Sequence, residues 1–411
     1  MVTAEAKSTK PEMPEGKPID PKDPTQGLVI GGYVQGQYES HQDSEDQLRQ
    51  GGALLNRDRF LVRRGRLKLE REWEYASLMM ELDGNTTNGP SMTLHHAEAS
   101  VLYRGDNVSS LPPMVKLTFG IFDTPFGYEL VESPRTRFFM ERSVASRAFF
   151  PSEPDVGARI SGALGWFRYA VAFVNGQPKD VKDFALQDPN AHKDFVVRVG
   201  GVVEPSKSLE FSFGTSFLGG NGFHKGTDAT KNGVVWRDSN ENGQIDAGEL
   251  QALPGQAATP SQNFDHWAVG GDLRVRLKTR LGWSMLYGEL QLASNLDRGN
   301  VVADPILTGN DYREIGYYVG FVQEIGQYVA VGLRTDYYNP NGDFFALQGG
   351  KNLPSKQTIR TLSPMIAGVL PGRARLVFQY DATKDYQARD PRGVPVDLKN
   401  NAWFLRLQVE L

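Results

Sequence analysis

The sequence predicts an all-β protein, a closed antiparallel transmembrane β-barrel of about sixteen strands. Segments of roughly ten to fourteen residues alternate apolar with polar side chains, as strands do when one face meets lipid and the other meets water. The connections alternate between very short turns and loops of roughly ten to forty residues, which is typical of the two rims of such a barrel. No apolar run reaches about eighteen residues, so a transmembrane helix is excluded.

The composition fits one large barrel. The 411 residues have a mean hydropathy of −0.42, which suits a soluble protein, but a barrel hides its apolar side chains at every second position. Cysteine is absent, which excludes disulfides and thiol chemistry. Residues 1–26 are rich in Pro and Lys and lack the apolar core of a secretory signal. We therefore expect a mature chain with a disordered or loosely attached extension at 1–26, followed by the barrel at 27–411.

Each predicted strand is justified by its alternation. In the third one, Leu78, Met80 and Leu82 fall on the lipid face, whereas Ser77 and Glu81 fall on the lumen face. The last strand must pair with the first, because an open edge would leave backbone groups without partners in hydrocarbon. The predicted strands are 28–39, 57–72, 73–83, 93–104, 114–122, 156–164, 166–174, 195–204, 209–218, 267–277, 281–292, 312–324, 328–338, 358–370, 374–382 and 403–411.

Several stretches together resemble the phosphate-selective porin O/P family, from about residue 28 through most of the chain. The resemblance implies a sixteen-stranded, usually trimeric channel for anions, including phosphate, in the bacterial outer membrane. Its partners would be outer-membrane lipid and lipopolysaccharide. The stretches are RFLVRRGRLKLE at 59–70, KLTFGIFDTPFGYE at 116–129, FMERSVASRAFFPSEPDVGARISG at 139–162, FRYAVAFVNG at 167–176, GGDLRVRL at 270–277 and YGEL at 287–290.

The connection 123–155 is the third long loop in this topology. The resemblance implies that it folds into the lumen and narrows it, as in general porins. Its aromatic content supports packing inside the barrel, whereas a surface lid of ordinary mixed composition is the alternative. Its charged residues are Glu129, Glu132, Arg135, Arg137, Glu141, Arg142 and Arg147, among Phe138, Phe139, Phe149 and Phe150.

Basic side chains outnumber acidic ones on the predicted lumen face, which favours a modest preference for anions. Arginine suits phosphate and carboxylate because its planar fork donates two parallel hydrogen bonds. The alternative is that these arginines pair with lumen acids and leave little selectivity. The predicted lining comprises Arg64, Arg66, Lys68, Lys116, Arg159, Arg168, Arg198, Arg274, Arg276, Arg334, Arg375 and Arg406 on the strands, with Arg135, Arg137, Arg142 and Arg147 on the loop. The predicted inward acids are Glu81, Glu98, Asp272, Glu289, Asp336, Asp381 and Glu410.

Arg63 does not fit the alternation. It falls on the lipid face of the second strand, where an arginine costs about 2–4 kcal/mol. Three explanations remain open: a position near a polar rim, a protomer interface, or a β-bulge that shifts the register.

The loop 219–263 contains a calcium-binding motif. The stretch 238–249 reads DSNENGQIDAGE and matches the EF-hand loop pattern at every required position. Gly243 provides the sharp turn, and the flanks do not read as EF-hand helices, so we expect an isolated structural Ca²⁺ loop of weak affinity. The predicted ligands are Asp238, Asn240, Asn242, Gln244, Asp246 and Glu249.

No catalytic residues are predicted. His95 and His96 follow each other on one strand, so alternation points them to opposite faces, where they could not chelate one metal together. Basic residues are dispersed, which argues against nucleic-acid binding. The predicted function is therefore a non-enzymatic porin, a passive diffusion channel for small hydrophilic solutes. An outer-membrane barrel enzyme or adhesin that acts through its external loops is the alternative.

Overall fold

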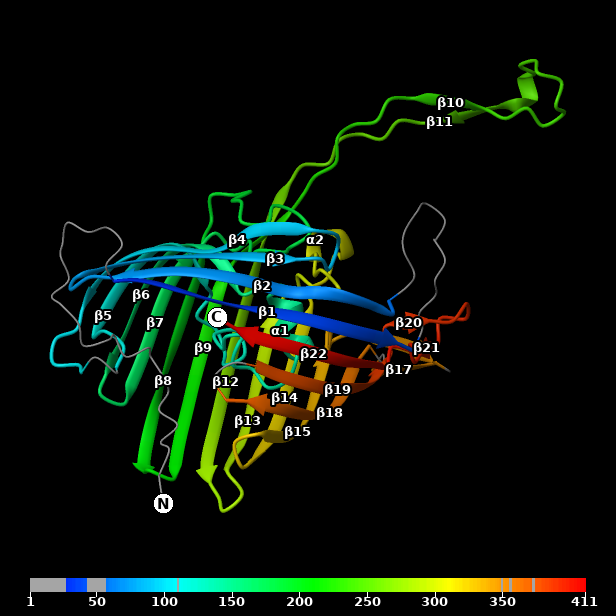
Figure 1. Ribbon diagram of the computed structural model, residues 1–411. Coiled ribbons are helices and arrows are strands. Elements are labelled where there is room, and N and C mark those ends of the chain that lie inside the picture. Colours follow the sequence, from blue (N-terminus) through cyan, green and yellow to red (C-terminus); the bar gives the residue numbers. More distant parts are fainter. Residues whose placement is uncertain (1–26, 43–56, 109–110, 349, 355–356, 372–373) are drawn as a thin grey trace.

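A computed structural model describes residues 27–42, 57–108, 111–348, 350–354, 357–371 and 374–411. The proposed extension at 1–26 lies outside the described residues. Sixteen of the described strands form one closed antiparallel barrel (Figure 1), as the alternation predicted. These strands are β1 (Leu28–His41), β2 (Arg59–Glu72), β3 (Ala76–Asn85), β4 (Ser91–Tyr103), β5 (Val115–Asp123), β6 (Pro154–Leu164), β7 (Phe167–Val174), β8 (Asp194–Ser206), β9 (Leu209–His224), β12 (Gln262–Lys278), β13 (Trp283–Ser294), β14 (Arg313–Ile325), β15 (Val329–Asn339), β18 (Ile359–Leu370), β19 (Ala374–Asp385) and β22 (Ala402–Glu410).

The first and last strands close the barrel. β1 pairs with β22 over nine residues, from Tyr33 opposite Glu410 to His41 opposite Ala402. The two faces of the wall differ as predicted. In β3, Leu78 and Met80 are 54% and 44% exposed on the outer face, whereas Glu81 is 9% exposed on the inner face. The exposed apolar belt is thus the surface that meets lipid.

The connections also follow the prediction, with one correction. Short turns join strands at one rim, and Gly165 and Gly326 adopt the positive φ angles that two of these turns require. At the other rim, β9 continues to His224 and β12 begins at Gln262, so part of the expected loop 219–263 is barrel wall. Its remainder forms an arm that extends far beyond the rim (Figure 1), built on the hairpin of β10 (Gly233–Trp236) and β11 (Leu250–Leu253).

Three two-stranded hairpins outside the barrel and two short helices complete the described fold. Besides β10 and β11, β16 (Phe345–Gln348) pairs with β17 (Lys351–Pro354), and β20 (Ala388–Arg389) pairs with β21 (Pro395–Val396). The helices are α1 (Val144–Phe149) and α2 (Pro305–Thr308), with a 3₁₀ turn at Ala247–Glu249. In the described part of the chain, no helix has the length and apolar character needed to cross a membrane.

Three register shifts interrupt the described ladders: one between β8 and β9, at Val203–Ser206, and two β-bulges in β2 and β4. Between β1 and β2, Gln35 faces Arg64 and Gly36 faces Val62, so Arg63 is an extra residue. Between β3 and β4, Glu81 faces His96 and Leu82 faces Leu94, so His95 is extra. A bulge turns two consecutive side chains toward one face. The bulge is therefore the correct explanation of Arg63 among the three that the sequence left open.

Candidate functional site

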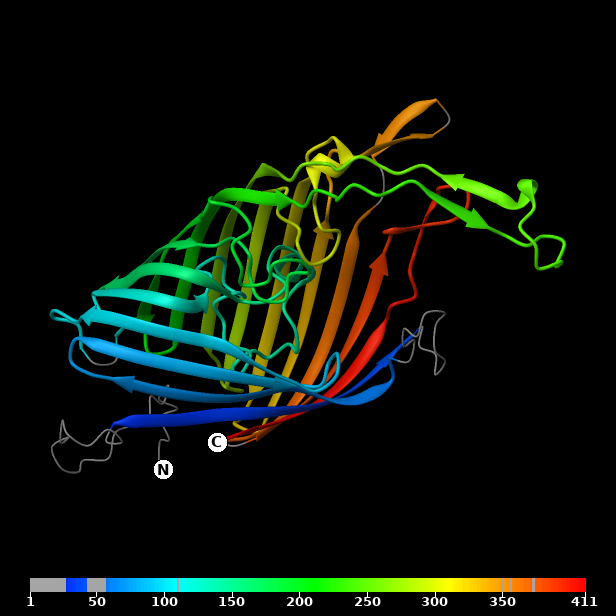
Figure 2. The same ribbon diagram turned by 90° about the horizontal axis from the view of Figure 1, so that it is seen from above.

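The β5–β6 loop, residues 124–153, lies within the ring of strands (Figure 2). Phe126, Phe149 and Phe150 are almost fully buried and pack in one apolar cluster with wall residues such as Leu218 and Tyr338. Burial of three aromatic rings removes a large apolar area from water and holds the loop against the wall. The loop includes α1, whose first turn is capped by the hydroxyl of Ser143.

Glu141 is the main polar anchor of this loop. Arg63 donates from Nε to Oε1 at 2.9 Å, Arg64 donates from Nη2 to Oε2 at 2.9 Å, and Arg406 donates from Nη2 to Oε1 at 2.7 Å. Burial opposes the charged form of Glu141, but these three guanidinium groups outweigh it and hold the pKa of the carboxyl well below its usual range. The Glu141 carboxylate therefore ties the loop to β2 and β22. Its single negative charge balances only one of the three arginine charges.

A second anchor ties the loop to another part of the wall, at β15. Arg334 of β15 donates from Nη1 to Oε1 of Glu129 at 3.0 Å and to the carbonyl oxygen of Glu141 at 2.8 Å. The other carboxylate oxygen of Glu129 accepts from the backbone N–H of Ser143 at 2.7 Å. Glu129 and Arg334 are only 1% and 3% exposed, so this is a buried, hydrogen-bonded ion pair.

Most of the predicted basic lining residues pair with an acid. The acids come from neighbouring strands and from the loop, so the alternative of paired charges holds for much of the wall. The pairs are Arg64 and Arg406 with Glu141, Arg66 with Glu81, Lys68 with Glu70, Lys116 and Arg159 with Glu98, Arg198 with Asp272, Arg274 and Arg276 with Glu210, Arg334 with Glu129, Arg135 with Glu410, Arg137 with Glu132, and Arg142 with Glu153.

Arg147, Arg168 and Arg375 have no ion pair with a described residue. Arg168 donates to backbone carbonyls of its own turn, and Arg375 donates to the carbonyl of Arg135 and the amide of Gln408. Arg147 differs from both. It lies exposed in the last turn of α1, and its guanidinium makes no hydrogen bond within the described chain.

Two chambers meet at Arg147. The β1 chamber is bordered by residues of β1, β18, β19 and β22, such as Gln37, Thr361 and Gln379. The β3 chamber is bordered by residues of β2, β3 and β4 and by Lys179. Five residues line both chambers and mark where they join: Arg63, Thr87, Glu141, Arg142 and Arg147.

The charge differs between these chambers. Six cationic and four acidic side chains line the β3 chamber, whereas the β1 chamber has five of each. A third chamber, toward the short-turn rim, contains Arg274 and Arg276 opposite Glu132 and Glu324. The positive excess is thus concentrated in the β3 chamber.

Sequence reasoning missed several inward-facing residues, three of which matter for the lumen. Arg63 and His95 are the bulge residues, and Glu210 of β9 accepts from Arg274 at 2.6 Å. A charged residue on the lipid face was the available signal for Arg63. His95 gave no such signal, and the expectation that it points away from His96 was wrong, because both imidazoles are buried in the lumen wall at 2% and 7% exposure.

Comparison with known proteins agrees with this geometry. Residues 34–184 match the family described as phosphate-selective porin O and P, which confirms the resemblance there. Over these residues the chain is similar to the porins of that family. A comparison with curated protein sequences gave no match.

Solved structures share the porin fold at low sequence identity. The outer membrane channel DcaP of Acinetobacter baumannii is 10% identical, with a TM-score of 0.57 over 93% of this chain and 97% of that chain. An anion-selective porin from Comamonas acidovorans is 10% identical, with a TM-score of 0.51 over 93% and 99%. OmpT of Vibrio cholerae in its trimer form is 9% identical, with a TM-score of 0.53 over 93% and 99%.

The predicted calcium motif lies at the tip of the β10–β11 arm. Both carboxylate oxygens of Asp238 accept backbone N–H groups, from Asn242 at 3.1 Å and from Gly243 at 2.8 Å. The side-chain amides of Asn240 and Asn242 both donate to Asp246 Oδ2, at 2.9 and 3.1 Å. Four of the predicted ligand side chains are thus within reach of one another, and Gly243 has the positive φ that the turn needs.

The remaining predicted ligands are placed differently. Glu249 is 8% exposed, and its carboxylate accepts from the indole N–H of Trp236 at 3.0 Å and from the backbone N–H of Ser239 at 2.9 Å. The Trp236 hydrogen bond is the main reason why the pKa of Glu249 lies below its usual value. The backbone N–H of Gln244 donates to Asn242 Oδ1 at 2.7 Å.

Proposed function

We propose that this outer-membrane porin is a passive diffusion channel with a modest preference for small anions, phosphate among them. The observation that carries the proposal is the junction of the two chambers, where Glu141 is shared by three arginines and Arg147 forms no ion pair with a described residue. A permeating anion gains energy beside this excess of positive charge, and a cation loses it. Pairing elsewhere along the wall keeps the preference modest.

Reversal potentials test this proposal. The purified protein, reconstituted in a planar bilayer under a gradient of potassium chloride, should give stepwise openings and a reversal potential with the sign of anion permeation. A cation-selective reversal potential would contradict the anion preference. A bilayer that stays sealed would contradict the channel itself and favour the alternative, a barrel enzyme or adhesin acting through its external loops. Sodium phosphate in place of chloride tests phosphate passage.

We also propose that the porin assembles as a homotrimer and that it contacts outer-membrane lipid and lipopolysaccharide. The trimer form of OmpT, which shares the fold, supports the assembly. The exposed apolar side chains of the barrel support the lipid contact. Chemical cross-linking in detergent checks the oligomer, and a purely monomeric pattern would contradict it.

We further propose that residues 238–249 bind a structural Ca²⁺ ion. The donor set is all oxygen, which a hard cation such as Ca²⁺ prefers. The turn at Gly243 and the convergence of Asp238, Asn240, Asn242 and Asp246 support this assignment. Bidentate binding by Glu249 requires its carboxylate to leave Trp236, so the affinity should be weak, about 10⁻⁴–10⁻³ M as in extracellular modules.

Calcium titration of the intact porin checks this assignment. Calorimetry should show heat of binding below about 1 mM Ca²⁺, as extracellular calcium modules do. It should show none in Asp238→Asn/Glu249→Gln. Trp236 fluorescence should change on binding, because its indole loses the Glu249 partner. The matched control is Asp228→Asn, an exposed acid on the same arm outside the motif. Identical titrations for the wild type and the double variant would refute the site.

A further inference from the structure

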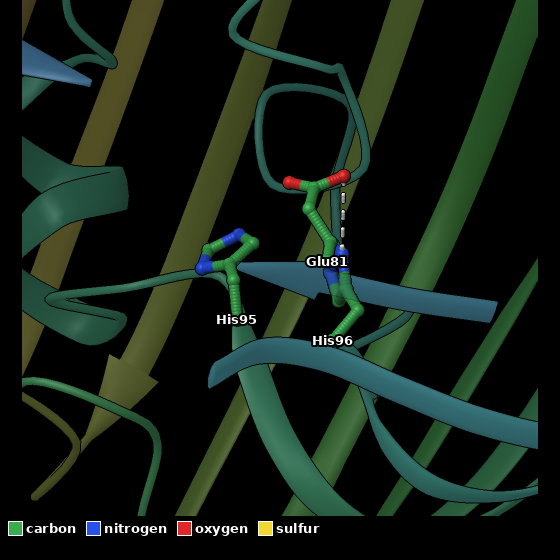
Figure 3. Close-up of side chains that lie close together, drawn as sticks. All are labelled: Glu81, His95 and His96. Atoms are coloured by element: carbon green, nitrogen blue, oxygen red, sulfur yellow. Dashed lines mark ion pairs between the residues drawn. The ribbon is translucent and has the colours of Figure 1, made fainter. Parts of the chain in front are cut away.

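The bulge in β4 creates a cluster of three side chains that the channel function does not use (Figure 3). Because His95 is the extra residue, His95 and His96 both turn into the lumen wall instead of facing opposite ways. Glu81 of β3 lies directly across the ladder from His96 and is 9% exposed. We call these three residues the His–Glu cluster.

The members of the His–Glu cluster face one another closely enough to share an ion. One ligand atom from each lies within 4.8 Å of the other two. Nδ1 of His96 is 3.8 Å from Oε2 of Glu81, the contact drawn in Figure 3. No other group of three His, Asp or Glu side chains in the described part of the chain meets this criterion.

Two ring nitrogens in the cluster lack hydrogen-bond partners. Nε2 of His95 and Nδ1 of His96 are both buried, and neither has a partner among the described residues. A buried polar atom without a partner costs about 1–3 kcal/mol. A bound metal ion would satisfy both nitrogens at once, which neither the wall nor the β5–β6 loop does.

Asp123 orients the imidazole of His96. Oδ1 of Asp123 lies 2.8 Å from Nε2 of His96. The carboxylate accepts a hydrogen bond there, so Nε2 carries the proton, and a neutral ring leaves its lone pair on Nδ1 toward Glu81. A carboxylate that orients a histidine in this way is the usual outer partner of a metal-ligating imidazole.

We propose that Glu81, His95 and His96 bind a divalent transition-metal ion of the Zn²⁺ type in the pore wall. Two imidazoles and one carboxylate form a common ligand set for such ions, with an open fourth position for water. His95 also lines the β3 chamber, which gives an ion in the pore direct access to the site. Oε1 of Glu81 keeps its ion pair with Arg66, at 3.0 Å, while Oε2 faces the metal position.

Nearby cations set the strength of binding. Nζ of Lys179 lies 3.5 Å from Nδ1 of His95, and Arg66 pairs with Glu81. Both positive charges oppose a second cation. The site should therefore bind more weakly than a closed structural zinc site, and Lys179→Met should strengthen it.

Zinc binding by the intact porin tests the proposal. After treatment with a chelator, the wild-type protein in detergent should bind one Zn²⁺ per chain in equilibrium dialysis. His95→Gln should weaken this binding at least about tenfold, and Asp123→Asn should weaken it about 10–100-fold, as loss of an outer-shell partner does. His192→Gln, which changes a histidine in the β7–β8 loop away from the cluster, is the matched control and should bind as the wild type does.

Two outcomes would overturn the site. One is a wild-type protein that binds no Zn²⁺, because His96 would then be a protonated structural link between Glu81 and Asp123. The other is a His95→Gln variant that binds as tightly as the wild type. His95→Gln leaves the hydrogen bond between His96 and Asp123 intact, and circular dichroism verifies that the barrel is folded before each titration. X-ray absorption at the zinc edge should show two imidazole ligands in the wild type.

Discussion

Replacing Arg147 with glutamate should reverse or abolish the anion preference of the channel. Arg147 borders both chambers at their junction and forms no ion pair with a described residue, so its exposed charge acts on permeating ions. A unit charge about 4 Å away is worth about 1 kcal/mol in water, so a change of two charges amounts to about 2 kcal/mol. Because about 1.4 kcal/mol corresponds to a factor of ten, the chloride-to-potassium permeability ratio should fall by about tenfold or more.

Reversal potentials of reconstituted single channels measure this ratio directly. The matched control is Arg392→Glu, which makes the same change at an exposed position that borders none of the three chambers and should leave the ratio as in the wild type. Arg147→Gln should fall between wild type and Arg147→Glu. An unchanged ratio in Arg147→Glu would mean that the junction does not control selectivity.

Replacing Arg334 with methionine should produce the largest loss of stability. Arg334 links Glu129 and the carbonyl of Glu141 to β15, and it lies 3.6 Å from Asp336. The substitution keeps the apolar stem but leaves Glu129 buried without its cation. Removing one partner of a buried pair costs about 3–5 kcal/mol. Unfolding by guanidinium in detergent, followed by tryptophan fluorescence, should therefore shift to a clearly lower midpoint.

A double variant separates the lost ion pair from simple loss of packing. Arg334→Met/Glu129→Gln removes the uncompensated charge, so it should recover part of the stability that Arg334→Met alone loses. The single variant should also release the β5–β6 loop, seen as noisier open-channel currents and faster proteolysis within residues 124–153. A midpoint for Arg334→Met that matches the wild type would contradict the anchoring role of this pair.

The barrel was predictable because its strongest signal is local. Alternation along β3 identified both of its faces, since each residue's environment there depends only on the pleat and on the two solvents. The same alternation led to the predicted basic lining, and three of its members, Arg64, Arg334 and Arg406, are buried in the structure.

The partners of those arginines were not predictable, because they come from distant parts of the chain. Glu141 joins Arg63 and Arg64 from one strand to Arg406 from another, more than two hundred residues apart in sequence. No periodicity in the sequence predicts that these side chains are in contact. It depends on how the β5–β6 loop packs inside the barrel, and that packing follows from the shape of the whole cavity.

The β-bulges in β2 and β4 were the second feature that the sequence did not predict. The alternation of apolar and polar residues does not reveal a single inserted residue. The exception is an insertion that would place a charged side chain in lipid if the strand were regular. Arg63 gave that warning, and His95 did not, because either face was acceptable for a histidine in the sequence pattern. The sequence also did not predict that β9 extends through Gly219, Gly220 and Gly222, because glycine has no side chain that could show the alternation.

The one-residue insertions in β2 and β4 show how a barrel can change the side chains that line its lumen without changing its number of strands. The circumference depends on the number of strands and on their stagger, and a one-residue bulge leaves the number of strands unchanged. Each insertion nevertheless adds one more functional group to the inside of the tube, next to a group that already pointed there. New chemistry can therefore be installed in a porin wall by adding a single codon, without redesigning the cylinder that crosses the membrane.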